Sequence, residues 1–176
     1  MIITYKVRLH PNNKQNTRLF EFAGAARFAY NWALDCKMKA FDKKEKFISE
    51  GDLRKQFTQF KKQPESEWTT SISNNVMKQA IRDCIKSYDR FFKLQKKPGY
   101  VKYSKNKLQR LDKLNKKPTP YDMTGHPKFK SRKCGAFSFY QDPIKIQFNK
   151  THVKLEKIST NLKKKRLNWI KLAEDE

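Results

Sequence analysis

The fold is decided by the stretch Arg27-Phe28-Ala29-Tyr30-Asn31-Trp32-Ala33-Leu34, in which three aromatic rings share two helical turns with a cation and an amide. Apolar residues recur around it at steps of three and four, which predicts a helix from Gln15 to about Met38 with one buried stripe. The stripe comprises Leu19, Phe22, Ala23, Ala26, Tyr30, Ala33 and Leu34. Some of the rings are therefore core residues, and Arg27 and Asn31, which share another face, remain as candidate ligand contacts.

The chain is strongly basic. It has 41 lysine and arginine residues against 17 acidic residues, and its formal net charge at pH 7 is +24. Solubility needs a net charge of only about 2 to 8 in a small domain, and a larger imbalance costs folding free energy through self-repulsion. We therefore expect a polyanionic partner, and nucleic acid is the polyanion that suits Arg27 and Asn31 best.

A membrane partner is not expected. The sequence has no run of about 18 apolar residues, and no segment divides cleanly into a basic and an apolar face. The first residues, Met1–Lys6, begin an alternating strand and do not resemble a signal peptide. We expect a cytoplasmic protein, in a prokaryotic cytoplasm or nucleoid or in a phage-infected cell.

Residues that could perform catalysis or hold a metal are not grouped in the sequence. Glycine is only 5 of 176 residues and forms no phosphate-binding loop. The cysteines and histidines are scattered, at Cys36, Cys84, Cys134, His10, His126 and His152. Their spacing matches neither a zinc site nor a nucleophile–base pair. We expect no catalytic residue, no metal ligand and no cofactor in this chain.

Two further helices follow the first. Ser49 caps a short helix with an apolar face, and Pro64 marks its end. A longer helix begins after Ser71 or Ser73 and runs to about Lys97, before Pro98-Gly99. Its polar face carries the candidate nucleic-acid contacts Asn74, Lys78, Gln79 and Arg82. Asn74 and Lys78 lie four residues apart and so share a face, although a helix cap and a solvated cation would explain them equally well.

The chain begins and ends with strand patterns. Alternation in Ile3–His10, in Phe137–Leu155 and around Trp169–Leu172 predicts strands, with a hairpin turn at Asn149-Lys150. Between residues 100 and 125 the periodicity fades, which favours a basic loop, although its leucines permit one short helix. Because the opening strand needs a partner that only the later strands supply, we predict an α+β fold in which helices are inserted into a small barrel or sheet.

Cations near the predicted strands complete the candidate interface. A basic run follows His126 and supplies Lys128, Lys130, Arg132 and Lys133. Arg8 lies on the polar face of the opening strand. Such side chains contact phosphates and position a protein without reading sequence.

Five motifs in order resemble a known family. They are Tyr5–Pro11, Ala26–Leu34, Tyr88–Lys93, Gly125–Arg132 and Val153–Leu155. The combination resembles the N-terminal part of the TnpB/OrfB proteins of insertion sequences, which are relatives of type V CRISPR effectors. Each motif alone is weak, and their order over nearly the whole chain makes the resemblance specific.

The resemblance implies an RNA-guided DNA endonuclease. It implies a wedge domain, an oligonucleotide-binding-like β-barrel (residues 1–11 and 127–176), interrupted by a helical recognition domain (residues 12–126, with the basic loop 100–125). It also places Asn74, Lys78 and either Tyr140 or Gln141 near the site that reads a short motif beside the DNA target. The family's nuclease domain and zinc ribbon, with their magnesium and zinc, would follow this region.

We therefore predict a non-catalytic nucleic-acid-binding part of such an endonuclease, with guide RNA and duplex DNA as partners. Cleavage would need a separate nuclease chain or a C-terminal part. One alternative is a stand-alone helix-turn-helix DNA-binding module that regulates a transposase. Another is a structural RNA-binding protein.

Overall fold

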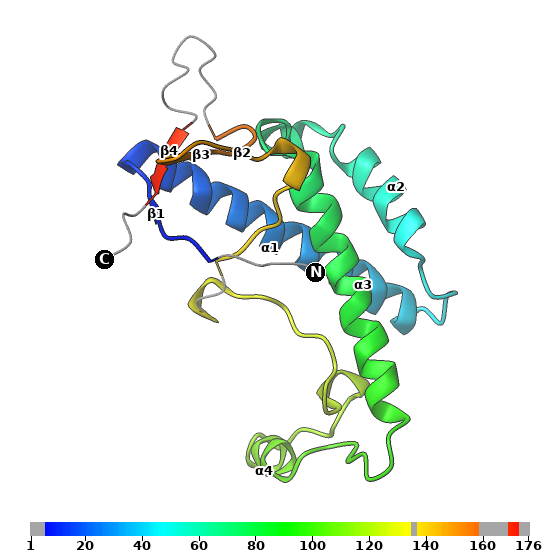
Figure 1. Cartoon of the computed structure of the whole chain (residues 1–176). Helices are drawn as coiled ribbons and strands as arrows, with labels where there is room; N and C mark the ends of the chain where they lie inside the picture. Colours follow the sequence, from blue (N-terminus) through cyan, green and yellow to red (C-terminus); the bar gives the residue numbers. More distant parts are fainter. Residues whose placement is uncertain (1–5, 135–136, 159–168, 173–176) are drawn as a thin grey trace.

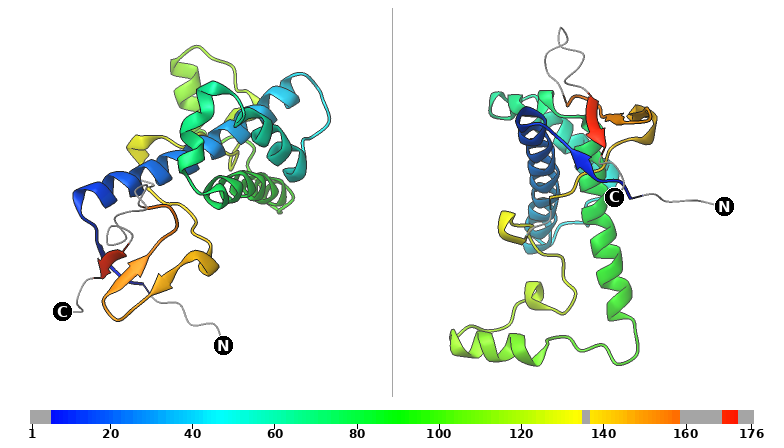
Figure 2. Two further views of the ribbon diagram at one scale, coloured as in Figure 1. Left: turned by 90° about the horizontal axis from the view of Figure 1, so that it is seen from above. Right: turned by 60° about the vertical axis from the view of Figure 1, so that its left-hand side comes forward.

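The computed structural model describes residues 6–134, 137–158 and 169–172. Its centre is a pair of packed helices, α1 (Asn13–Asp42) and α3 (Asn74–Gln95), with the shorter α2 (Glu50–Phe60) against α3. A small sheet lies beside the N-terminal ends of α1 and α3, and α4 (Lys105–Lys113) lies at the opposite end of the molecule (Figures 1 and 2). Both long helices are therefore sheet-bound at one end and free of the sheet at the other.

The sheet joins the two ends of the described chain. Its antiparallel strands lie in the order β1 (Leu9–His10), β4 (Trp169–Leu172), β3 (His152–Lys154) and β2 (Gln147–Phe148). Leu9 is the register partner of Leu172, and Val153 is that of Ile170. The predicted pairing of the opening strand with the C-terminal strands is confirmed, as are the α+β class and the hairpin.

The strands are shorter than the alternation predicts. The described sheet is open, with β1 and β2 at its edges, so these residues do not close a barrel. Of the predicted opening strand only Leu9–His10 is paired, and residues 1–5 lie outside the described part. Phe137 and Phe139 belong to no strand. Their rings instead pack on Phe20 and Phe22 of α1, at centroid distances of 5.2 and 5.3 Å, which accounts for their alternation.

The aromatic stretch of α1 is a packing joint. Trp32 meets Phe57 of α2 edge to face at 5.0 Å, and Phe28 meets Trp68 in the same way at 5.2 Å. Tyr30 is buried on the side of α1 that packs against the rest of the core. Aromatic pairs of this geometry each contribute about 0.5–1.5 kcal/mol beyond the area they bury. These rings hold α1, α2 and the turn before α3 together.

Capping explains where the helices begin. Asn12 Oδ1 accepts a hydrogen bond from the backbone nitrogen of Gln15 at 2.9 Å, and the backbone nitrogen of Asn12 donates to Gln15 Oε1 at 3.0 Å. With this capping box α1 starts earlier than predicted. Ser49 Oγ accepts from the backbone nitrogen of Asp52 at 3.2 Å, as the sequence predicted for α2. Ser73, rather than Ser71, caps α3.

Residues 105–113 form a helix, whereas the fading periodicity of this segment favours a loop. Leu111 is its single buried residue, and Lys107 Nζ lies 2.8 Å from Asp122 Oδ1. The ion pair ties α4 to the Pro120–Asp122 turn. The leucine spacing in this segment is that of a helix, but the polar residues around the leucines obscure the pattern in the sequence.

Candidate nucleic-acid interface

A groove of about 300 Å³ separates α2 from α3. Its lining residues are Gly51, Arg54, Lys55, Phe57, Thr58, Lys61, Asn74, Met77, Lys78 and Ile81. Cations from both helices face it, and the described residues that line it include no acidic side chain. The structure thus brings the predicted pair Asn74 and Lys78 together with three cations that sequence reasoning did not single out.

Lys61 shows that the groove is electropositive. Its Nζ donates a hydrogen bond to Asn74 Oδ1 across the groove. The pKa of Lys61 is lowered, first by partial burial and then by repulsion from Lys78 and Lys157. A cation whose pKa is pushed down by other cations is one that an approaching anion would stabilise. The groove therefore favours phosphate groups or the acceptor edges of bases.

Gln79 and Arg82 lie on the same helix but have partners within the protein. Gln79 Nε2 donates to Asp83 Oδ1 at 2.9 Å. Arg82 Nε donates to Glu50 Oε1 of α2 at 3.2 Å, in an ion pair that is about half exposed. In this arrangement Arg82 joins α2 to α3 and Gln79 braces its own helix.

Side chains near the sheet fix the start of α3. Ser73 is buried and donates its hydroxyl hydrogen to Glu156 Oε2 at 2.6 Å. Asn75 Nδ2 donates to Asp142 Oδ2 at 2.9 Å. Asn74 lies between these two anchored residues, so its position is set relative to the sheet as well as to α2.

Tyr140 and Gln141 lie beside this anchor, because Asp142 follows them directly. Tyr140 is exposed. The side-chain amide of Gln141 is buried, and neither Oε1 nor Nε2 has a hydrogen-bond partner among the described residues. An unpaired buried amide costs about 1–3 kcal/mol. Of the two, Tyr140 is the residue that an external ligand can reach in this conformation.

Asn31 stabilises the fold through two hydrogen bonds. Its Nδ2 donates to the carbonyl oxygen of Lys130 at 2.9 Å, and its Oδ1 accepts from the backbone nitrogen of Lys130 at 2.8 Å. Both polar atoms of the amide are thus used in holding the residue 130 segment onto α1. The neighbouring candidate Arg27 is half-buried and lines a surface hollow with Phe129 and Asp35.

The remaining predicted cations are on the surface. Exposed side chains include Arg8, Lys128, Lys130, Arg132 and Lys133. Lys130 Nζ also lies 4.2 Å from the centroid of the Tyr30 ring, a cation–π contact that directs this side chain along α1.

The described residues contain no helix long and apolar enough to cross a membrane. Over the same residues, no three or more His, Cys, Asp or Glu side chains gather in a way that could hold a metal ion.

Comparison with a protein-family model gives a match in the N-terminal part of the chain. The family model of the OrfB/IS605 helix-turn-helix domain matches residues 1–46. In this chain those residues contain β1 and the uninterrupted α1, and α2 begins just beyond them.

Two relatives are named as RNA-guided DNA endonucleases. InsQ of Escherichia coli (strain K12) is 26% identical over 101 residues, which are 57% of this chain and 25% of InsQ. A protein of Streptomyces pristinaespiralis is 26% identical over 106 residues, which are 60% of this chain and 26% of the relative. The matched segments thus span about a quarter of the length of these relatives.

Proposed function

We propose that this chain is an N-terminal part of a TnpB/OrfB-type protein, which the family-model match and the two relatives support, and that it binds guide RNA and the duplex DNA beside the target without cleaving either. In this proposal the sheet region (residues 1–11 and 127–176) is the wedge, completed as an oligonucleotide-binding-like barrel. Residues 12–126 are the recognition domain. Base pairing with the guide would read the target sequence, and the protein would read helix shape and a short adjacent motif.

The groove between α2 and α3 supports the DNA-binding part of the proposal most directly. Asn74 can pair bidentately with adenine, and Lys78 can donate to guanine or to a phosphate. Lys61 and Lys55 would meet the backbone on either side. Because Ser73 and Asn75 are bonded to the sheet region, Asn74 would be held in one orientation while the duplex is read.

The charge supports the RNA-binding part. Exposed cations occur on α4, on the segment from Lys128 to Lys133 and near β1, and so extend well beyond the groove. An A-form heteroduplex is bound through its backbone, which needs a distributed positive surface more than precise contacts.

The test is the nucleic acid that the purified chain carries and how binding depends on salt. One discrete RNA should co-purify, and the logarithm of the duplex binding constant should fall linearly with the logarithm of salt concentration. The slope should be about −0.9 for each phosphate neutralised. A binding constant that does not change with salt would contradict the electrostatic basis of the proposal.

A cleavage assay separates binding from catalysis. The chain incubated with Mg²⁺ and duplex DNA should leave the DNA intact. Reproducible cleavage that an internal Asp or Glu substitution abolishes would contradict the non-catalytic role.

The match to a helix-turn-helix domain supports a second candidate, a DNA-binding regulator of a transposase. This candidate differs from the first in its RNA requirement. RNA-free protein that shifts duplex DNA would favour it, whereas bulk ribosomal RNA in the preparation would indicate a structural RNA-binding protein.

A further inference from the structure

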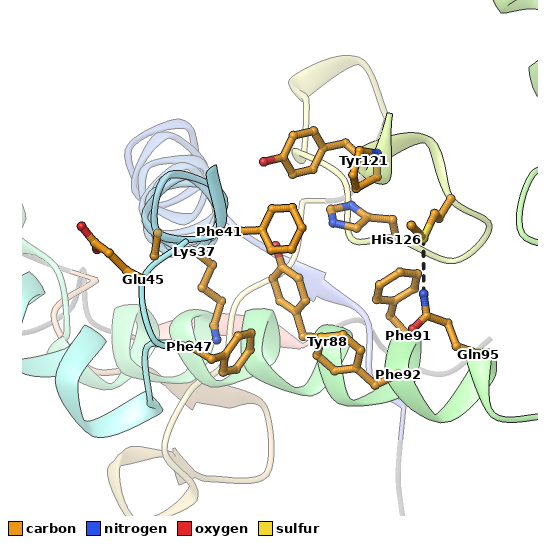
Figure 3. A pocket seen from close by; sticks show the side chains of 13 residues that line it. Lys37, Phe41, Glu45, Phe47, Tyr88, Phe91, Phe92, Gln95, Tyr121 and His126 are labelled. Atoms are coloured by element: carbon orange, nitrogen blue, oxygen red, sulfur yellow. Dashed lines mark hydrogen bonds between the residues drawn. The ribbon is translucent and has the colours of Figure 1, made fainter. Parts of the chain in front are cut away.

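A second concavity, of about 320 Å³, lies toward the other end of α3, between α1 and residues 120–126 (Figure 3). We call it the aromatic pocket, after the rings Phe41, Phe47, Tyr88, Phe92, Tyr121 and His126. Three of these rings are largely open to solvent: Phe41 is 59% exposed, Phe47 52% and Phe92 41%. Exposed aromatic surface gathered in one hollow marks a binding site more than a core.

The local sequence builds the pocket from both sides. After α1, Lys44 adopts a positive φ of 57°, which turns the chain back so that the Phe47 ring meets Tyr88 at 5.8 Å. On the other side Gly125 has φ of 80° and abuts α3, and His126 follows it into the rings. The His126 ring lies edge-on to Tyr88 at 5.6 Å. The rings are therefore held in place before any ligand arrives.

The pocket wall contains a buried cation. Lys37 is 3% exposed, and its Nζ donates to the carbonyl oxygen of Ile48 at 2.9 Å and lies 3.1 Å from the Phe47 ring centroid. Burial lowers the pKa of Lys37 to about 8, so the ammonium is still mainly charged at pH 7. It has three protons, of which Ile48 takes one. The group is costly to bury and can donate to an acceptor in the pocket.

The surroundings of the pocket are basic. Exposed lysines follow α1 at positions 43, 44 and 46 and follow Phe92 on α3 at positions 93 and 96. Of the three carboxylates beside the pocket, Asp42 accepts from the Tyr121 hydroxyl and Asp122 pairs with Lys107. The third, Glu45, is exposed and directs its carboxylate away from the rings (Figure 3). An apolar protein segment would need no such cations, whereas a nucleotide combines a flat ring with an anionic backbone.

We propose that the aromatic pocket binds an unpaired base of a bound RNA strand, which stacks on Phe41 and Phe92 while Lys37 donates to an acceptor atom of the base. The lysines around the pocket contact the phosphates on either side. The inference rests on the proposed function, because it assigns one site for RNA on the same molecule. Stacking on aromatic side chains is the usual way in which unpaired RNA bases are recognised.

The experiment compares two RNA hairpins that differ in one feature. One hairpin is blunt, and the other carries a single-stranded 3′ tail that contains 2-aminopurine. The wild-type chain should bind the tailed hairpin more tightly, and the 2-aminopurine fluorescence should fall on binding as the base stacks. Equal affinities for the two hairpins, with unchanged fluorescence, would overturn the inference.

Substitutions in the aromatic pocket test whether its rings cause the tighter binding of the tailed hairpin. Phe41→Ala with Phe92→Ala should weaken binding of the tailed hairpin by about tenfold and leave binding of the blunt hairpin unchanged. Phe148→Ala is the matched control, because Phe148 is 63% exposed on β2, outside the pocket. Equal losses on both hairpins would assign the rings to folding and contradict the inference.

Two further outcomes keep the claims separate. If the double variant does not fold, as judged by its thermal melt, the fluorescence of the wild-type complex decides the question. If the wild-type chain binds neither hairpin in a salt-dependent way, the proposed function itself fails. Binding of both hairpins without any gain from the tail contradicts only the aromatic pocket.

Discussion

The two ends of α3 use cations and rings in opposite ways. In the groove beside α2, Lys61 and Lys78 face the opening, and the nearby ring of Phe57 is buried. In the aromatic pocket, Phe41 and Phe92 face the opening, and the cation Lys37 is buried. A net charge of +24 therefore does not identify the ligand contacts. The burial and the bonding partners of each cation identify those contacts.

The largest expected effect is a loss of stability from a change at the aromatic-pocket end of α3 alone. Gly125→Ala should lower the free energy of unfolding by about 2–3 kcal/mol, because a Cβ at φ of 80° is strained and would lie 2.5 Å from Leu94 Cδ2. Urea denaturation measures this. Gly24→Ala is the control, since no heavy atom outside the helix backbone lies within 4 Å of its Cβ and helix propensity favours alanine. Equal destabilisation by both changes would contradict the account of Gly125.

The next change weakens the start of α3, beside the groove. Ser73→Ala removes the cap of α3 and leaves Glu156 without its hydroxyl donor, so we expect a loss of about 1–2 kcal/mol and weaker sequence preference on DNA. Ser104→Ala at the start of α4 removes a serine that makes no side-chain capping bond and should be nearly neutral. A neutral Ser73→Ala would show that the link to the sheet does not hold α3.

Lys37→Met should stabilise the unbound protein at pH 7 by about 1 kcal/mol, because it removes a buried charge and keeps the apolar stem. The pKa of Lys37 is about 8 in the fold and near 10.5 when exposed, so the unfolded chain binds more protons between these values. Wild-type stability should therefore rise with pH through that window, and the advantage of the variant should shrink there. Chemical denaturation at pH 7 and pH 9.5 measures both values; a constant difference would contradict the assignment.

The smallest expected effect concerns an ion pair between the helices that form the groove. Arg82→Ala removes the bond to Glu50, in which the arginine side chain is about half exposed, and should cost no more than about 0.5 kcal/mol. A thermal melt beside Lys78→Ala provides the comparison. A large loss of stability would mean that the α2–α3 packing depends on this pair.

Sequence pattern predicted the elements and the pairing that depend on local periodicity. The stripes of α1 and α3, the Ser49 cap, the Asn149-Lys150 hairpin and the pairing of β1 with a C-terminal strand all follow from neighbouring residues and one rule of topology. The alternation at Phe137 and Phe139 wrongly predicted a strand, because a segment packed on a helix can also alternate. The pattern reflects two rings that contact α1 and not a hydrogen-bonded ladder.

The site was predicted only where its residues share one helix. Asn74 and Lys78 could be placed on one face by spacing, but no local signal joins Lys61 to Asn74. Asn31 and Lys130 are 99 positions apart. The sequence around either residue therefore does not indicate that the Asn31 amide bonds to the Lys130 backbone. The aromatic pocket draws on segments spread from Lys37 to His126 and becomes visible only in three dimensions.

The central claim is that the groove between α2 and α3 reads duplex DNA beside the target. Its most direct test is the affinity of the wild-type chain and of the Asn74→Ala/Lys78→Ala variant for a pool of duplexes with randomised sequence. If the groove reads base sequence, the variant loses preference among sequences and keeps most of its total affinity. Equal losses on every sequence would contradict the claim and make both residues simple phosphate contacts.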